Sequence, residues 1–579
     1  MRNKLIYILL GVSTLGGFSS CDVDTFPETQ LSDGNFWNTT ADLRMAANYF
    51  YSTLPGLTDS EVRQDVWSPF AYSNSGDQRS ISDGSRIAPA SSGDYSYYNI
   101  FQANKLIEKA GEVLAKGAVE ADVNSFIAEA KFFRAYYYFE MFKRFGGVPI
   151  ITKTMSVNDT DIFLPRASRE ELFGLMVEDL DFAASHLKTA DQLNAAKEYG
   201  RISKTGAIAL KARIALFEGT RQKYHNYGNP SITLTLAKDA AEQVINSGEH
   251  SIYSRPTSGS NGEILNEAYF SLFQEAGEGR ANKENIIVKA YGINQANSII
   301  STPVQRYFEG SNVVPTQNFV DNYIMADGLP IDKSPLYTTP TNSTTHASYF
   351  EKKDPRMSFT IFKRGDEFIQ SSNYSIPNPR QHVSGYGVRK YSNKAFWQIQ
   401  ASFIDRPVLR YAEVLLTYAE ALYELNGTIS DADLDKTINL LRARLPQVNI
   451  GTPAMPNFVS LPKLSNSFVS TNGLNMRDEL RRERIVELGF EGQAYWDLIR
   501  WKTAEIEMAK TLKGSYFFAE YLTDPGEKWG ANTALDANKF IVLQDASLRK
   551  FDPNKDYLWP IPLDEIAKNP KIEQNPGWE

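Results

Sequence analysis

The sequence predicts a mainly α-helical protein whose helices pair across short turns and pack against a loop-rich second region with a few short strands. Three observations lead to this prediction. Apolar residues recur at helical spacing along much of the chain, capping and stop signals bracket many of these stretches, and long segments rich in Ser, Gly and Pro show no such period.

The first two helices are predicted over 98–115 and 123–145. In the first, Ile100, Ala103 and Ile107 repeat at helical spacing. The second ends at Gly146-Gly147-Val148-Pro149, because glycine and proline together stop a helix.

A third helix is expected to begin at Ser168 and to run to about Leu187. Glu171 lies three residues after Ser168, which is the spacing of a capping box. The same periodicity predicts further helices over 204–219, 234–248, 409–425, 432–445 and 476–488.

Short turns predict three helix pairs: 98–115 with 123–145, 168–188 with 203–219, and 409–425 with 432–445. Their alanine-rich contact faces resemble tetratricopeptide-type units. Because the period is irregular, an ordinary helical domain remains the alternative.

Long segments without helical period separate these helices: 59–95, 254–391, 451–475 and 513–554. One short strand is predicted at Asn285-Ile286-Ile287-Val288. The aromatic content of these segments favours ordered, functional loops.

The N-terminus has the order of a bacterial lipoprotein signal. A basic start is followed by a short apolar run to Leu15, small residues and Cys21, the only cysteine of the chain. We predict a signal peptide over 1–20, acylation of Cys21, and a polar tether over 21–35. A plain secretory signal with a chance cysteine is the alternative.

Composition and charge limit the function. The formal net charge is −8, and loss of Arg2 and Lys4 with the signal leaves about −10, which argues against a nucleic-acid partner. A single cysteine excludes a disulfide framework and a cysteine-based zinc site. Beyond the signal, no apolar run is long enough to cross a bilayer.

The sequence lacks the common enzyme and metal-binding motifs. The five histidines lack the HExxH spacing, and neither a GxSxG elbow nor a GxxxxGK[ST] loop occurs. We therefore expect a protein that is not an enzyme and has no cofactor; whether a structural calcium ion binds is left open. Eight charged residues are expected to form ion pairs between helices: Arg134, Arg410, Glu413, Glu420, Arg481, Glu483, Arg484 and Glu487.

The candidate ligand residues are aromatic and polar side chains in loops. Aromatic faces stack on sugar rings, and amides, carboxylates and guanidinium groups bond the hydroxyl rim. The predicted glycan-binding residues are Trp67, Tyr72, Asn74, Asp77, Arg79, Tyr291, Phe396 and Trp397, the last two in a polar loop before helix 409–425. For each loop aromatic, the alternative is a plug over the core.

A series of segments resembles the SusD/RagB family of nutrient-binding outer-membrane lipoproteins. Two of them read AEAKFFRAYYYFEMFKRFGGVPIIT and RRERIVELGFEGQAYWDLIRW. In family order, the similar segments are Tyr98–Ala110, Ala128–Thr152, Gly200–Gly219, Pro315–Ile331, Lys352–Met357, Gly385–Tyr391, Arg406–Leu422, Arg481–Trp501 and Tyr557–Trp578.

The resemblance implies a fold, a place and a partner. The fold is a SusD-like domain over 36–579, with an N-terminal helical part (36–250), a loop-rich part (251–405) and a C-terminal helical part with loops (406–579). Asp22 and Asp24 resemble the surface-export signal of such lipoproteins, which places the chain on the outside of the outer membrane. The implied partner is a SusC-like TonB-dependent transporter barrel.

The implied function is capture of oligo- or polysaccharide for that transporter. Three alternatives stay open at this point: capture of oligopeptides, a surface glycosidase, and a structural or adhesion lipoprotein without a ligand.

Overall fold

The computed structural model describes residues 33–57, 64–75, 79–156, 158–159, 162–291, 313–368, 373–399, 402–523, 529–530 and 532–579. The predicted signal peptide, Cys21 and most of the tether lie outside these ranges. The tether prediction is corrected at its end, because Asp33–Phe36 forms the short helix α1.

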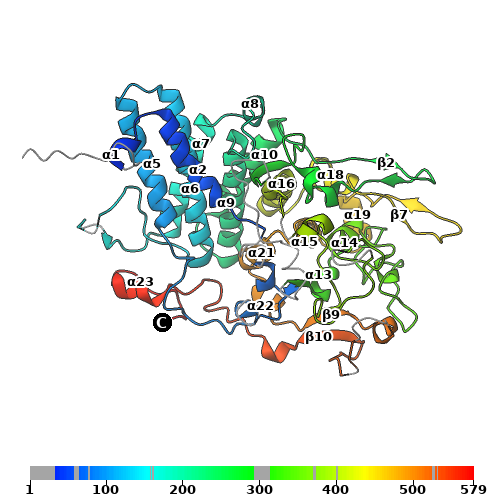
Figure 1. Ribbon diagram of the computed structural model, residues 1–579. Coiled ribbons are helices and arrows are strands. Elements are labelled where there is room, and N and C mark those ends of the chain that lie inside the picture. Colours follow the sequence, from blue (N-terminus) through cyan, green and yellow to red (C-terminus); the bar gives the residue numbers. More distant parts are fainter. Residues whose placement is uncertain are drawn as a thin grey trace, which may run out of the picture.

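A curved layer of long helices makes up one half of the molecule (Figure 1). Each helix packs against the next in the order α5, α6, α7, α9, α10, α16, and α20 then packs on α16 while α2 packs on α5 and α6. Their bounds are α2 Thr40–Ser52, α5 Tyr98–Ala115, α6 Glu120–Phe145, α7 Arg169–His186, α9 Lys204–His225, α10 Pro230–Asn246, α16 Tyr411–Asn426 and α20 Met476–Glu487.

Apart from α2, these helices agree with the sequence prediction in type and order. The capping box of α7 is confirmed, since Ser168 Oγ accepts the Glu171 N–H at 3.1 Å and Glu171 Oε2 accepts the Ser168 N–H at 2.8 Å. Helix α6 ends at Gly146, whose φ of 77° few other residues adopt at low cost.

The prediction and the structure differ at three elements. Residues 432–445 form two short helices, α17 (Asp431–Lys436) and α18 (Ile438–Ala443), because Thr437 leaves helical geometry at φ −128° and ψ −93°. Leu409 and Arg410 end strand β6 (Arg406–Arg410), and helix α16 begins directly after them. Helix α2 was not predicted.

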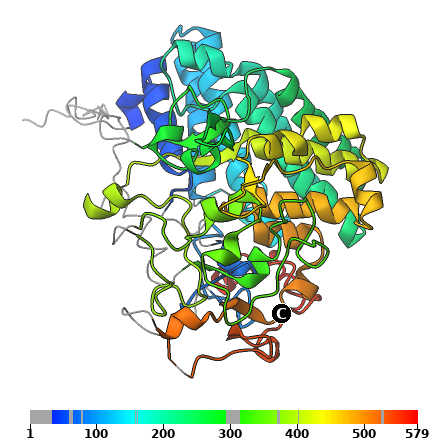
Figure 2. The same ribbon diagram turned by 90° about the vertical axis from the view of Figure 1, so that its right-hand side faces the viewer.

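The second half of the molecule is built from short helices and loops around small antiparallel ribbons (Figure 2). The short helices are α11 Ala268–Ser271, α13 Gln317–Val320, α14 Pro355–Thr360, α15 Lys394–Ile399, α19 Asn466–Thr471, α21 Ala494–Arg500, α22 Ala504–Glu507 and α23 Leu563–Lys568. The short helix α8 (Ala190–Ala195), which follows α7 in the chain, lies with the helical layer (Figure 1). The 3₁₀ turns are η1 Gln64–Trp67, η3 Glu275–Gly277, η4 Ser348–Phe350, η5 Ala519–Leu522 and η6 Ala546–Leu548.

Five two-stranded ribbons occur in the described ranges. They are β1 (Ala71–Tyr72) with β5 (Val314–Pro315), β2 (Thr257–Ser258) with β3 (Ile264–Leu265), β4 (Asn285–Lys289) with β6, β7 (Val448–Asn449) with β8 (Phe458–Val459), and β9 (Leu512–Tyr516) with β10 (Phe540–Gln544). The predicted strand at 285–288 is confirmed as β4.

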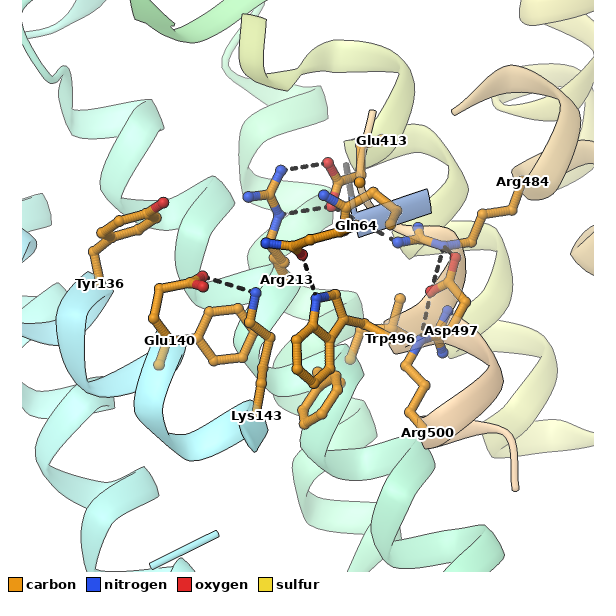
Figure 3. A pocket seen from close by; sticks show the side chains of 15 residues that line it. Gln64, Tyr136, Glu140, Lys143, Arg213, Glu413, Arg484, Trp496, Asp497 and Arg500 are labelled. Carbon is orange, nitrogen blue, oxygen red and sulfur yellow. Dashed lines mark hydrogen bonds and ion pairs between the residues drawn. The ribbon is translucent and has the colours of Figure 1, made fainter. Parts of the chain in front are cut away.

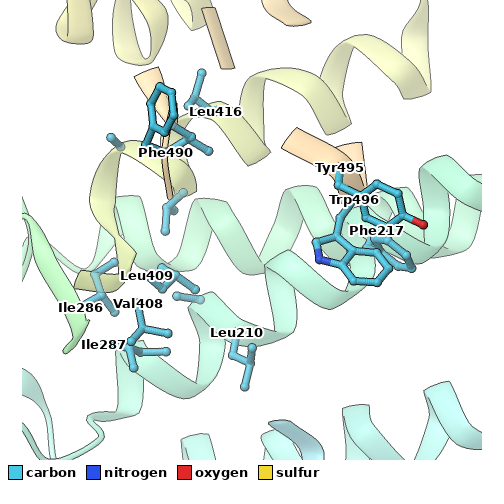
Figure 4. Packing of buried hydrophobic residues seen from close by; sticks show 14 of the residues in the cluster. Leu210, Phe217, Ile286, Ile287, Val408, Leu409, Leu416, Phe490, Tyr495 and Trp496 are labelled. Carbon is cyan, nitrogen blue, oxygen red and sulfur yellow. The ribbon is translucent and has the colours of Figure 1, made fainter. Parts of the chain in front are cut away.

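One continuous apolar core joins the two halves. Ile286 and Ile287 of β4 and Val408 and Leu409 of β6 pack in the same cluster as Leu210 of α9 (Figure 4). The ribbon thereby fixes the loop-rich half against the helical layer, and burial of this apolar surface stabilises the arrangement.

A buried charge network crosses the same boundary. Arg410 at the end of β6 donates to Glu284, Glu487 and Glu491 at 2.7 to 2.9 Å. Arg356 of α14 donates to Glu487 and Glu483 at 3.0 and 2.6 Å. The surrounding guanidinium groups hold the pKa of the Glu487 carboxyl far below its ordinary value although burial raises it.

The predicted ion pairs are confirmed for all named residues but one. Arg134 pairs with Asp179, Glu413 with Arg213, and Arg484 with Asp497. The prediction for Arg481 is wrong: among the described residues no ion pair or hydrogen bond includes its side chain, which lies instead over the rings of Tyr224 and Trp501.

Candidate functional site

Trp67 lies in the core, and its interpretation as an exposed stacking residue is corrected. It ends the turn η1 and is 7% exposed. Its ring meets Tyr495, Trp496 and Trp559 edge-on at centroid distances of 5.7, 6.2 and 5.1 Å. All sides of the indole that could stack on a ligand therefore contact protein.

Three of the predicted residues gather at one edge of the loop-rich half. Tyr72 of β1 is buried by Val314 and Leu512, and its hydroxyl accepts a hydrogen bond from Arg79 Nη1 at 2.6 Å. Asn74, two residues beyond Tyr72, is exposed. Asp77 lies outside the described residues.

A loop over 373–383 connects this edge to Trp397. Val383 packs against the cluster that contains Tyr72. The ring of the neighbouring His382 is hydrogen-bonded through Nδ1 to the Tyr374 hydroxyl at 3.0 Å. Tyr374 in turn belongs to an aromatic cluster on which the half-buried Trp397 packs.

That aromatic cluster consists of Phe362, Phe368 and Tyr374. Their ring centroids lie 5.1 Å apart in each pair, with Phe362 stacked on Tyr374. Sequence reasoning missed these residues, because they are spread over a segment without helical or strand period. Only their aromatic type, in a chain with 12% aromatic residues, could have drawn attention to them.

We use the name loop face for the surface formed by Asn74, Arg79, residues 373–383 and Trp397. Tyr72, which is only 6% exposed, is corrected to a core position. Asn373, Ser375 and Arg380 are exposed on it. The loop face thus combines an aromatic foundation with amide, hydroxyl and guanidinium groups, which is the side-chain chemistry that holds a polar ring with an apolar face.

Tyr291 and Phe396 do not reach the loop face surface and are corrected to core positions. Tyr291 is 4% exposed, and its N–H donates to Asp405 Oδ1 at 2.7 Å. Phe396 is 5% exposed and packs edge-on against Phe403. The predicted polar loop that carries Phe396 and Trp397 is the short helix α15.

Around Tyr291, two carboxyl groups have raised pKa values. Asp405 accepts the Tyr199 hydroxyl at 2.6 Å as well as the Tyr291 N–H, and burial raises its pKa to about 6. Glu278 accepts the Asp405 N–H at 3.2 Å, and burial together with the Asp405 charge raises its pKa to about 8. Asp405 therefore uses its carboxylate oxygens to hold Tyr199 and Tyr291 in the packed core.

A small cavity in the helical core is not large enough for a nutrient ligand (Figure 3). Its volume is about 30 Å³, and it is lined among others by Gln64, Glu140 and Arg213. Trp496 Nε1 donates to Gln64 Oε1 at 2.7 Å, and Arg213 holds Glu413 with two hydrogen bonds. A space of this size holds one or two water molecules.

The described ranges contain no cluster of three or more His, Cys, Asp or Glu side chains that could hold a metal ion. Within the same ranges, no helix combines the length and the apolar character needed to span a membrane.

A layer of paired helices and a loop-rich half, bound together by a buried charge network, define a helical scaffold protein that carries its long loops on one side. The chain belongs to the SusD family: the family model described as "SusD family" matches residues 282–578. A second family model, described as "Starch-binding associating with outer membrane", matches residues 44–216.

Curated relatives cover the whole chain. A SusD-like protein of Formosa agariphila is 26% identical over 597 residues, which span 99% of each chain. A SusD-like protein of Bacteroides ovatus is 23% identical and covers 100% of this chain and 98% of its own.

Solved structures show the same fold. A SusD-like carbohydrate binding protein from Bacteroides fragilis superposes with a TM-score of 0.70 at 22% identity, over 93% of this chain and 100% of its own. The surface glycan-binding protein A from Bacteroides fluxus gives a TM-score of 0.59 at 19% identity, over 93% of this chain and 100% of its own.

Proposed function

We propose that this protein is a lipid-anchored protein of the outer cell surface that binds glycans and delivers them to a SusC-like TonB-dependent transporter, without chemical turnover. Family membership is the observation that carries the proposal, because the two family models together match both the helical and the loop-rich half. The lipoprotein-like signal ending at Cys21 supports the anchoring.

The loop face is the proposed glycan site. Trp397 is half-buried and backed by the cluster of Phe362, Phe368 and Tyr374, so one aromatic surface has firm support. Arg79, Asn74 and Arg380 supply donors and acceptors for hydroxyl groups. The names of the compared structures describe binding of carbohydrate by those proteins, which supports a glycan for this one.

Two experiments test this function. Isothermal titration of the purified chain against panels of oligosaccharides and oligopeptides should show binding of at least one glycan, and product analysis after incubation should show the glycan unchanged. Binding of peptides alone, or robust glycan cleavage, would contradict the proposal.

The partner is tested separately. Tagged protein in mild detergent should co-purify a TonB-dependent barrel from cells grown on the nutrient, and the complex should bind the glycan more tightly than the isolated chain, because two surfaces then enclose it. Recovery of the tagged chain alone would remove the transporter from the proposal and leave a surface binder.

A further inference from the structure

A groove with a volume of about 420 Å³ lies between α13, α20 and the α21–α22 region; α13, α21 and α22 are labelled in Figure 1. No residue of the loop face lines it. Its lining residues are Phe70, Asn318, Asp321, Asn322, Asp478, Arg481, Arg482, Ile485, Leu498, Trp501, Thr503, Glu507 and Lys510. This volume is within the range of small-molecule sites in proteins.

Arg481 brings to the groove a guanidinium group that has no ion pair among the described residues. Its guanidinium carbon lies 4.7 Å from the centroid of the Trp501 ring and 5.0 Å from that of Tyr224. Two of its nitrogens, Nε and Nη2, are buried and have no hydrogen-bond partner among the described residues. A buried donor without an acceptor is costly, and more so when it is charged.

The unpaired edge of Arg481 is the edge that this protein uses elsewhere to bind carboxylates. Arg134 holds Asp179 through Nε and Nη2, both at 2.7 Å. Arg410 holds Glu491 through the same two nitrogens at 2.9 and 2.8 Å. A planar oxyanion therefore matches the free edge of Arg481 in shape and in charge.

The other cations of the groove already have partners. Lys510 pairs with Glu507 at 2.6 Å, and Arg482 pairs with Glu479 at 3.4 Å. Each of these cations has a neighbouring carboxylate, so among the described cations of the groove Arg481 is the one left to pair with an incoming acidic group.

The remaining polar groups of the groove suit hydroxyl groups. Asn318 and Asn322 bring amides, of which Asn318 Oδ1 accepts the Lys513 N–H and Asn322 Nδ2 donates to the Asn318 carbonyl. Asp478 is an exposed carboxylate, and Thr503 Oγ1 is buried with no hydrogen-bond partner among the described residues. Phe70 and Leu498 line the same space with apolar surface. Acceptors and donors around an apolar floor bind the rim and face of a sugar ring.

We propose that this groove is a second carbohydrate site, which takes a sugar residue bearing an oxyanion, either a uronate carboxylate or a sulfate ester, on Arg481. The guanidinium turns its Nε and Nη2 edge away from the Tyr224 and Trp501 rings toward the acid, while the sugar hydroxyls bond the amides and Asp478. The inference rests on the proposed function, since it names an acidic class of glycan and a separate place for it.

The test compares matched ligands and matched variants by isothermal titration at low ionic strength. The ligands are oligouronides and their neutral methyl esters, and sulfated oligosaccharides and their desulfated forms. We expect the acidic member of one pair to bind about ten- to a hundredfold more tightly, which is the usual range for a charge-assisted hydrogen-bonded pair.

Arg481→Gln should remove this preference for the acidic member, and Arg481→Lys should restore part of it. Arg482→Gln, one residue away and in the same groove, should keep the preference and serves as the control. Thermal unfolding of each variant verifies that it is folded. In the wild type, ligand binding should move Arg481 off the Trp501 ring and thereby change the tryptophan fluorescence.

The outcomes separate the two proposals. Equal binding of the acidic and neutral members, or an acid preference that survives in Arg481→Gln, overturns the second site and leaves the glycan function in place. Absence of binding by every oligosaccharide overturns both.

Discussion

Arg500 and Glu420 form a buried pair joined by two hydrogen bonds, with Nη1 to Oε1 at 2.5 Å and Nη2 to Oε2 at 2.7 Å. The indole of Trp501 donates to the same carboxylate at 2.6 Å. These donors hold the pKa of Glu420 at about 2 although burial raises it. The pair ties α21 to α16 across a distance of eighty residues in the chain.

Glu420→Gln should therefore lower the free energy of unfolding by about 3–5 kcal/mol, because it leaves the Arg500 charge buried with only Asp497 as counter-ion. Urea denaturation measures this change. As a control, Lys109→Gln removes a partly exposed pair with Glu112 and should change stability by less than about 1 kcal/mol. Equal effects of the two variants would contradict the role of the buried pair.

Trp67→Ala should destabilise the protein by about 3–5 kcal/mol, because it opens a cavity against Tyr495, Trp496 and Trp559. Ligand affinity of the folded fraction should not change. The measurements are thermal unfolding and titration on the same sample. A loss of affinity at unchanged melting temperature would return Trp67 to the binding site.

Trp397→Ala, in contrast to Trp67→Ala, should reduce affinity and not stability. It should weaken glycan binding by about 1–3 kcal/mol, the range found for stacking of bases on an aromatic side chain. Its stability should change little, since the ring is only half-buried. Phe396→Ala, next in the chain but buried against Phe403, is the matched control and should lower stability without a direct loss of contacts to ligand.

Acid should destabilise the protein partly through His250. Its ring bonds the Thr205 hydroxyl at 2.9 Å and the Lys283 carbonyl at 3.1 Å, and burial lowers its pKa to about 4. The unfolded chain binds a proton near pH 6.5, whereas the folded chain does so only near pH 4. Stability from this group is therefore complete above pH 6.5 and is lost as the pH falls toward 4.

One such group changes the free energy of unfolding by at most about 1.4 kcal/mol per pH unit. His250→Gln, which cannot titrate in this range, should flatten the dependence of the unfolding free energy on pH between 6.5 and 4. Denaturant unfolding at a series of pH values measures both slopes. Parallel curves for wild type and variant would assign the acid sensitivity to other groups.

Cys21→Ala should release the folded protein from the membrane, because acylation of the single cysteine is the predicted anchor. Cell fractionation and protease accessibility on whole cells measure this. Stable membrane association of the variant would contradict a lipid anchor at Cys21.

The sequence by itself determined those helix ends and helices whose formation depends on residues a few positions apart in the chain. The Ser168 and Glu171 capping box, the stop at Gly146 and the apolar period of α5 act over a few residues, so local pattern is enough to predict them. The strand β4 and the helix order follow for the same reason. Thr437 shows the limit, because the break between α17 and α18 has no local glycine or proline signal.

Only the tertiary structure decided which loop aromatics face outward. Trp67 and Trp397 both lie in segments without period, and nothing in either neighbourhood distinguishes a plug from a binding surface. The rings that bury Trp67 belong to Tyr495, Trp496 and Trp559, more than four hundred residues away. Burial depends on such distant partners. So does the pairing of Arg481, which shares its motif with the ion-paired Arg484 but has no ion pair among the described residues and lies over the rings of Tyr224 and Trp501.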